Sequence, residues 1–99
     1  VLTGRDIGAT EAERIGLATL VFPDDGFADT VAAYAAQLAA GPPVALALSK
    51  RLLLTSATAT LDAQLREELT HIKTCFATAD VREAMQAFAE KRAPTFTGR

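Results

Sequence analysis

Five large apolar side chains recur at helical spacing in one segment of the second half of the chain. Leu61, Leu65, Leu69, Ile72 and Phe76 follow one another at intervals of four, four, three and four residues. This spacing places them on one side of an α-helix, whereas a strand would alternate every second residue. Because charged and polar residues fill most positions between them, the sequence predicts an amphipathic helix with one apolar face to bury.

The N-terminal part of the chain predicts a short helix followed by an extended run. Thr10 and Glu13 have the spacing of a capping box, in which each side chain bonds the backbone N–H of the other residue. Gly16 is the expected end of that helix, because glycine readily adopts the left-handed conformation found there. The apolar run 17–22 predicts a short extended segment, which we expect to form a lone edge strand.

Helical signals fill the rest of the chain. One helix is predicted over 27–40, and a second, apolar on several faces, over 43–54. Thr60 is the expected N-cap of the helix that carries the apolar stripe. Asp80 is the expected N-cap of a final helix, with Glu83 as its capping-box partner. The predicted fold class is therefore mainly α, with four to five helices and one short extended segment.

The composition provides little material for a self-contained core. Apolar residues make up 49% of the chain, but 21 of them are alanine. Alanine favours helices but buries little apolar area, so it drives compaction weakly. We therefore expect the chain to rely on another surface for part of its stability.

Charge, hydropathy and cysteine content bear on the partners and the compartment. The net charge is −2 and no dense basic patch is present, which argues against a nucleic-acid partner. No apolar run reaches the roughly 20 residues of a membrane-spanning helix, so no membrane partner is expected. The lone Cys75 cannot form an intrachain disulfide and is expected to be a buried, inert thiol. A reducing compartment fits it best, and we expect a cytoplasmic protein.

Neither a metal site nor a catalytic group is predicted from the residues. His71 is the single histidine, with Glu67 and Cys75 at helical spacing on either side. These are too few ligands for a metal ion, and we expect His71 to lie partly exposed on a helix surface. The acidic residues, Glu83 among them, suit helix starts, where negative charge is favourable.

Phe88 and Lys91 are the candidate binding residues. They are three residues apart and share one side of a helix. An aromatic ring beside an ammonium group could flank a purine and meet a phosphate. The alternative is a core phenylalanine next to a solvated lysine at a helix C-terminus.

Three segments of the chain resemble the crotonase superfamily, the enoyl-CoA hydratases and isomerases. They are "LTGRDIGATEAERIGLATLVFP", "LAAGPPVALALSKRLL" and "DVREAMQAFAEKRAPTFTG". The positions that carry the resemblance are Leu2, Thr3, Gly4, Ile7, Ala9, Glu11, Ala12, Gly16, Leu17, Val21, Leu38, Ala39, Pro42, Pro43, Ala45, Ser49, Lys50, Asp80, Glu83, Ala87, Phe88, Glu90, Lys91, Arg92, Pro94 and Phe96. Ala84 stands where the family commonly has glycine.

The resemblance covers the whole chain and corresponds to the C-terminal third of the family. It implies that residues 1–99 are the C-terminal helical region of a crotonase-like fold, with a β-spiral catalytic core upstream. The first residue, Val1, agrees with that expectation. The core would carry the oxyanion hole and the acidic groups, so no catalytic residue is expected here. The implied reaction is hydration of a trans-2-enoyl-CoA thioester, with isomerase and other CoA-thioester activities as alternatives.

The resemblance also implies partners and ligand contacts. In the family, these helices cover the core and build the trimer interface, and the last helix closes over CoA. Phe88 and Lys91 match positions that flank the adenine and approach its phosphate, and Arg92 is a weaker candidate. The expected partners are an acyl-CoA substrate, the protein's own core and further copies in a trimer or hexamer, with no permanently bound cofactor. The alternative, supported by the apolar segment 43–54, is a non-enzymatic helical oligomerisation module.

Overall fold

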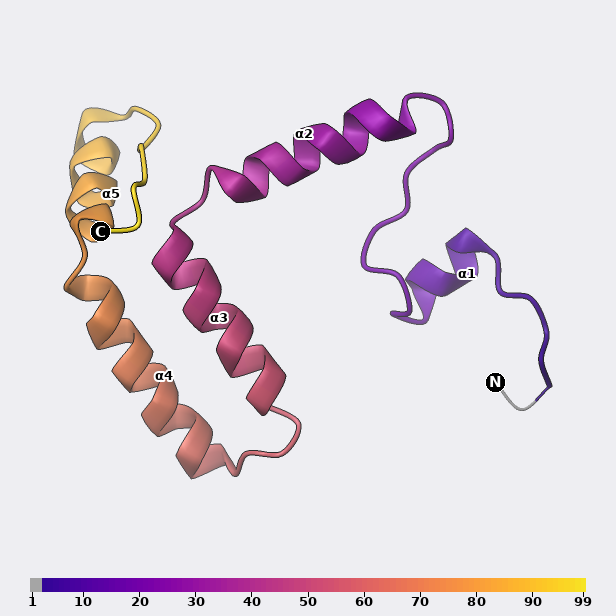
Figure 1. The fold of residues 1–99 in the computed structure, drawn as a ribbon, viewed down its shortest axis with the longest axis horizontal. Coiled ribbons are helices and arrows are strands. Elements are labelled where there is room, and N and C mark those ends of the chain that lie inside the picture. Colours follow the sequence, from indigo (N-terminus) through magenta and orange to yellow (C-terminus); the bar gives the residue numbers. More distant parts are fainter. Residues whose placement is uncertain (1–2) are drawn as a thin grey trace. The chain divides into compact units, whose positions relative to one another are not determined.

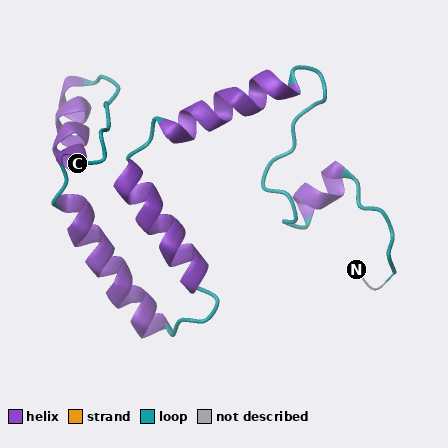
Figure 2. Cartoon of the chain, viewed as in Figure 1, coloured by secondary structure: helices purple, strands orange, loops and turns teal. Residues whose placement is uncertain are grey.

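A computed structural model describes residues 3–99, and these contain five helices joined by loops (Figures 1 and 2). The helices are α1 (Ala9–Arg14), α2 (Phe27–Ala39), α3 (Pro43–Thr55), α4 (Leu61–Phe76) and α5 (Ala79–Glu90). The mainly α class is confirmed, and the last four helices match the predicted segments closely. Leu2, one of the positions that carry the family resemblance, lies outside the described residues.

The edge strand predicted over 17–22 is wrong, because residues 3–99 include no strand. A strand is stable only when a neighbour accepts and donates its backbone hydrogen bonds. Phe22 packs instead against two aromatic rings of α2. Its ring centroid lies 6.5 Å from that of Phe27 and 6.3 Å from that of Tyr34.

The short helix α1 begins earlier than the sequence predicts. Gly8 is its N-cap, and Thr10 lies inside the helix, so the predicted capping box is wrong. The first intrahelical bond runs from the N–H of Ala12 to the carbonyl of Gly8 (2.9 Å). The predicted stop is confirmed, since Gly16 adopts a left-handed φ of +75° just after the helix.

The chain divides into two compact units, residues 1–35 and 36–99. In the second unit, α3 and α4 form an αα-hairpin (Figure 1). The predicted cap of α4 is confirmed: the Oγ1 of Thr60 accepts a hydrogen bond from the N–H of Ala63 at 3.3 Å. The side-chain amide of Gln64 donates to the carbonyl of Leu52 in α3 (3.1 Å), and Arg51 pairs with Glu67 at 3.3 Å.

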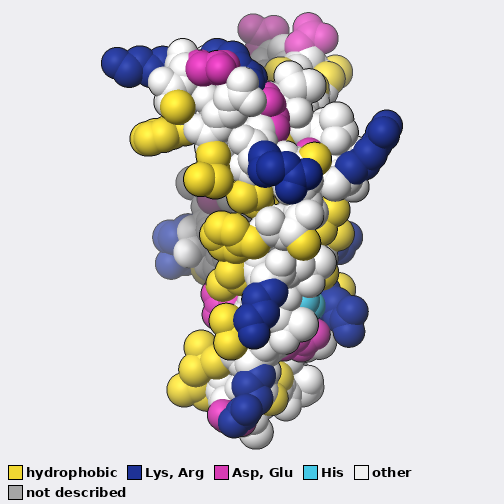
Figure 3. Space-filling model, turned by 90° about the vertical axis from the view of Figure 1, so that its left-hand side faces the viewer, with side chains coloured by type: hydrophobic (Ala, Val, Ile, Leu, Met, Phe, Trp, Pro, Cys, Tyr) yellow, Lys and Arg dark blue, Asp and Glu magenta, His cyan; other side chains and the backbone are white. Residues whose placement is uncertain are grey.

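The side of α4 that faces α3 is not its apolar stripe. The more covered positions of α4 are Gln64, Glu67, His71 and Cys75, which share a different side of the helix. The five stripe residues remain between 44% and 75% exposed. Figure 3 shows hydrophobic side chains among basic ones on the face that α4 and α5 present. The described residues therefore leave most of the stripe uncovered, and only its C-terminal residues, Ile72 and Phe76, border a cavity beside α3.

Apolar burial within the described residues is small. Ala87 is the one buried apolar residue there, and Leu53 and Leu54 of α3 are about three-quarters exposed. This agrees with the expectation that these helices rely on another surface. No single described helix is long and apolar enough to cross a membrane, and α2 and α3 reach that length and composition only as a bent pair.

Candidate functional site

Helix α5 carries Phe88, ends just before Lys91 and begins at a threonine cap. The Oγ1 of Thr78 accepts a hydrogen bond from the N–H of Val81 (3.4 Å) and donates to the carbonyl of Cys75 (2.7 Å). The predicted N-cap at Asp80 is therefore wrong, because Asp80 lies in the first turn of the helix. Its negative charge is favourable there, next to the free N–H groups of the helix start.

The carboxylate of Asp80 fastens the end of the chain to this first turn. Its two oxygens accept hydrogen bonds from the N–H groups of Thr97 (2.7 Å) and Gly98 (2.9 Å). The carbonyl of Arg99 accepts a further bond from the N–H of Ala79. Asp80 is only 4% exposed, and a buried carboxylate is tolerated when such donors surround it. The C-terminal tail therefore runs back along α5 (Figure 1).

Glu83 provides the second attachment of the tail and is not a capping-box partner. Its carboxylate receives two bonds from the guanidinium of Arg92, at 2.6 and 3.0 Å, and one from the N–H of Thr95 at 2.9 Å. The Arg92 guanidinium, together with the Thr95 N–H, lowers the pKa of Glu83 to about 2. Arg92 also donates from Nε to Glu90 at 2.6 Å. Arg92 thus forms ion pairs with two carboxylates, which argues against a direct contact between Arg92 and a ligand.

Phe88 and Lys91 lie at the opposite end of α5. Phe88 is 88% exposed, so it is not a core residue of the described chain. Lys91 follows the last helical residue and adopts a left-handed φ of +55°. Its N–H bonds the carbonyl of Phe88 (3.2 Å), and the N–H of Arg92 bonds the carbonyl of Ala87 (3.0 Å). This pair of bonds is a Schellman motif, which ends the helix.

The arrangement suits a ligand that has both an aromatic ring and a negative charge. The Phe88 ring is available for stacking, and within residues 3–99 no carboxylate pairs with the ammonium of Lys91. The sequence placed these two residues on one helical face. The structure joins them through a backbone hydrogen bond, with Lys91 just beyond the helix.

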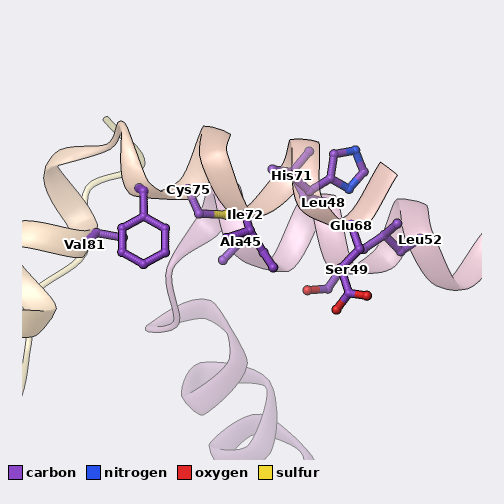
Figure 4. Close-up of a pocket in the computed structure, with 10 residues that line it drawn as sticks. Ala45, Leu48, Ser49, Leu52, Glu68, His71, Ile72, Cys75 and Val81 are labelled. Atoms are coloured by element: carbon purple, nitrogen blue, oxygen red, sulfur yellow. The ribbon is translucent and has the colours of Figure 1, made fainter. Parts of the chain in front are cut away.

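A pocket of about 220 Å³ lies between α3 and α4 (Figure 4). Its lining comprises Ala45, Leu48, Ser49, Leu52, Glu68, His71, Ile72, Cys75, Phe76 and Val81. His71 is only 8% exposed, so the prediction of a partly exposed surface histidine is wrong. It is covered because the α4 side that bears it packs on α3. Cys75 is half-buried, less covered than predicted.

The polar groups around His71 are few. Its Nε2 lies 3.7 Å from a carboxylate oxygen of Glu67, and its Nδ1 has no hydrogen-bond partner within the described part of the chain. No group of three potential metal ligands occurs among those residues either. Sequence reasoning missed the burial of His71 because the stronger apolar signal lies on another side of α4.

Solved structures define the class of fold. An enoyl-CoA hydratase of Bacillus anthracis superimposes with a TM-score of 0.91 at 31% identity, covering all of this chain and 38% of that one. An enoyl-CoA hydratase/isomerase of Mycobacterium abscessus gives a TM-score of 0.91 at 35% identity, covering 99% and 38%. The helical fold of this chain is therefore that of part of the crotonase fold.

The sequence comparisons identify the family. The family "Enoyl-CoA hydratase/isomerase" matches residues 1–99, and the chain belongs to it. A probable enoyl-CoA hydratase of Mycobacterium tuberculosis is 41% identical over 98% of this chain and 35% of its own length. A 1,2-epoxyphenylacetyl-CoA isomerase of Escherichia coli is 37% identical over 99% and 37%. The chain thus spans little more than a third of these relatives, and the resemblance inferred from the sequence is confirmed at the level of the family.

Proposed function

We propose that this chain is the C-terminal helical region of an enoyl-CoA hydratase/isomerase that acts on acyl-CoA thioesters. The reaction is the hydration of a trans-2-enoyl-CoA, and its reactive groups belong to a preceding β-spiral core. There, an oxyanion hole stabilises the enolate while carboxylates handle water and the proton. The chain matches only about a third of each relative, which supports the proposal that the catalytic groups lie in a separate part of the protein. CoA enters as part of the substrate and not as a permanent cofactor.

The role of this region in the reaction is to hold the nucleotide end of the substrate. The observation that carries the proposal is the exposed ring of Phe88 at the end of α5, followed by Lys91, whose ammonium has no carboxylate partner among residues 3–99. A purine stacks on an aromatic face, and a lysine ammonium attracts a phosphate as a point charge. The adenine and the phosphates of CoA present these two features together.

The test is the substitution Lys91→Ala in the complete enzyme. We expect CoA to bind roughly 10- to 150-fold more weakly by isothermal titration calorimetry, because a charged hydrogen bond contributes roughly 1.5–3 kcal/mol. The KM for the thioester should rise by more than kcat falls, since the proposed contact is with the nucleotide end of the substrate and not with the thioester. Lys73→Ala, on the exposed surface of α4, is the matched control. An unchanged dissociation constant for CoA would remove Lys91 from the binding site.

The second role is assembly, in the cytoplasm, into a homotrimer or hexamer. The apolar stripe of α4 supports it, because a face of this kind is stable in water only when it is covered. The catalytic core and neighbouring copies are the proposed covers.

The same stripe favours a second candidate, a non-enzymatic helical oligomerisation module. The coding sequence immediately upstream of Val1 separates the two candidates. An open frame with a glycine-rich oxyanion segment and acidic residues supports the enzyme, whereas a start codon at Val1 supports the module. Hydratase activity of the full-length product on a short enoyl-CoA then tests the enzyme directly.

A further inference from the structure

The backbone of Lys91 adopts a conformation that residues with a side chain rarely take. Its φ of +55° is left-handed, and elsewhere in residues 3–99 positive φ angles occur only at glycines. An L-residue with a Cβ atom is strained in this region, and the conformation persists only where the surroundings enforce it. The residues around Lys91 must therefore supply that enforcement.

Arg92 enforces it through both its backbone and its side chain. Its N–H is bonded to the carbonyl of Ala87 inside α5 (3.0 Å). Its guanidinium is held by both carboxylate oxygens of Glu83, one turn after the helix start, and its Nε by Glu90. Lys91 thus lies between the helix and a residue anchored to that same helix. A change of Lys91 to a negative φ would move Arg92 relative to these contacts.

The tail beyond Arg92 strengthens this anchor. Glu83 also accepts the N–H of Thr95, and Asp80 accepts the N–H groups of Thr97 and Gly98. Together these contacts attach the tail to the first turns of α5 and leave its last turn, with Phe88, uncovered.

We propose that Glu83 and Arg92 are positioning residues that hold Lys91 in place for a phosphate of CoA. This inference rests on the proposed function above. It adds that the contact between Glu83 and Arg92 keeps the backbone of Lys91 in one conformation. Neither residue needs to touch the ligand. When Arg92 is released, Lys91 is free to take an ordinary backbone conformation, and its long side chain then loses more freedom when the ligand binds.

The test is Glu83→Gln in the complete enzyme, titrated with free coenzyme A. We expect binding weaker by about three- to tenfold, the usual loss when one flexible side chain must be ordered on binding. KM should rise by more than kcat falls. Electrostatics alone predicts tighter binding, because removing a negative charge from the protein favours the binding of coenzyme A, which is itself a polyanion. Glu13→Gln on α1 makes the same charge change at an exposed site and is the control.

A double variant asks whether Glu83 acts through Lys91. If it does, Glu83→Gln weakens CoA binding in the native background and adds no loss once Lys91→Ala is present. An equal loss in both backgrounds would show that Glu83 acts elsewhere and would overturn the inference. If Lys91→Ala weakens binding but Glu83→Gln does not, the inference fails while the proposed function stands. If Lys91→Ala has no effect, the proposed contact between Lys91 and CoA fails as well.

A conservative variant tests whether weakened CoA binding results only from unfolding. Arg92→Lys keeps the charge but loses the bidentate contact with Glu83. It should therefore weaken CoA binding, as Glu83→Gln does. Hydrogen exchange of the Thr97 and Gly98 amides, which Asp80 binds, reports whether the tail still docks in each variant. Weakened binding with these amides still protected supports the positioning role. Normal binding by Arg92→Lys, despite a mobile Lys91 backbone in relaxation measurements, contradicts it.

Discussion

Glu83 shows how a single side chain links the fold to pH. Its pKa in the folded chain is about 2, against a usual value of 4.5, and the first cause is the hydrogen-bonded guanidinium of Arg92. Because the folded pKa is the lower one, the ion pair stabilises the fold fully above about pH 4.5. That contribution is lost as the pH falls from 4.5 towards 2.

The acid titration of Glu83 is therefore a direct prediction. We expect the side-chain carboxyl carbon of Glu83, followed by NMR, to titrate with a midpoint near 2. Protection of the Thr95 amide, which the same carboxylate binds, should disappear over the same range. In Arg92→Lys the midpoint should move up towards 4.5, because the two-pronged contact is lost. A native midpoint near 4.5 would show that the ion pair does not form in solution.

At the scale of the helices, the sequence predicts where each one lies better than how each one begins. Thr60 is a cap as predicted, since it directly precedes Leu61, the first residue of the apolar stripe. Asp80 and Glu83 have capping-box spacing, but Thr78 provides the cap and the two carboxylates bind the tail. Asp80 and Thr97 are 17 residues apart in the sequence, and no local pattern reports such a contact. The sequence also could not decide whether Phe88 is exposed, because its spacing fits a core residue equally well.

The cap of α4 provides a prediction for that helix. Thr60→Ala removes the acceptor for the N–H of Ala63 and should lower the free energy of unfolding by about 1 kcal/mol. Thr70→Ala is the matched control, because Thr70 lies in the middle of α4 and only bonds back to Arg66. Alanine is the better helix former there, so this variant should be neutral or slightly stabilising. Urea unfolding followed by circular dichroism measures both. Equal effects of the two substitutions would show that the cap contributes nothing.

At the scale of the whole chain, the orientation of α4 is the main finding. The helix packs on α3 with its more polar side and leaves most of the apolar stripe uncovered by the described residues. The sequence predicts the stripe correctly but cannot tell which neighbour covers it. A neighbour outside the chain leaves no pattern in the sequence. The burial of His71 was missed for a different reason, because the sequence does not show which side of α4 packs on α3.

This orientation predicts self-association of the isolated chain. Sedimentation velocity at rising concentration should show species larger than a monomer, because the stripe is covered most easily by another copy. Leu65→Lys together with Leu69→Lys places two charges in the stripe and should shift the chain towards monomer. Thr70→Lys, on the same helix but outside the stripe, should leave association unchanged. A compact monomer at every concentration would contradict the prediction.

The return of the tail along α5 has a practical consequence for handling the protein. The carbonyl of Arg99 is bonded to the N–H of Ala79, so anything joined after Arg99 emerges beside the first turn of that helix. Phe88 and Lys91 lie at the other end, and a helix of 12 residues is about 18 Å long. A fluorophore or surface-immobilisation handle attached there therefore starts well away from the proposed nucleotide contacts.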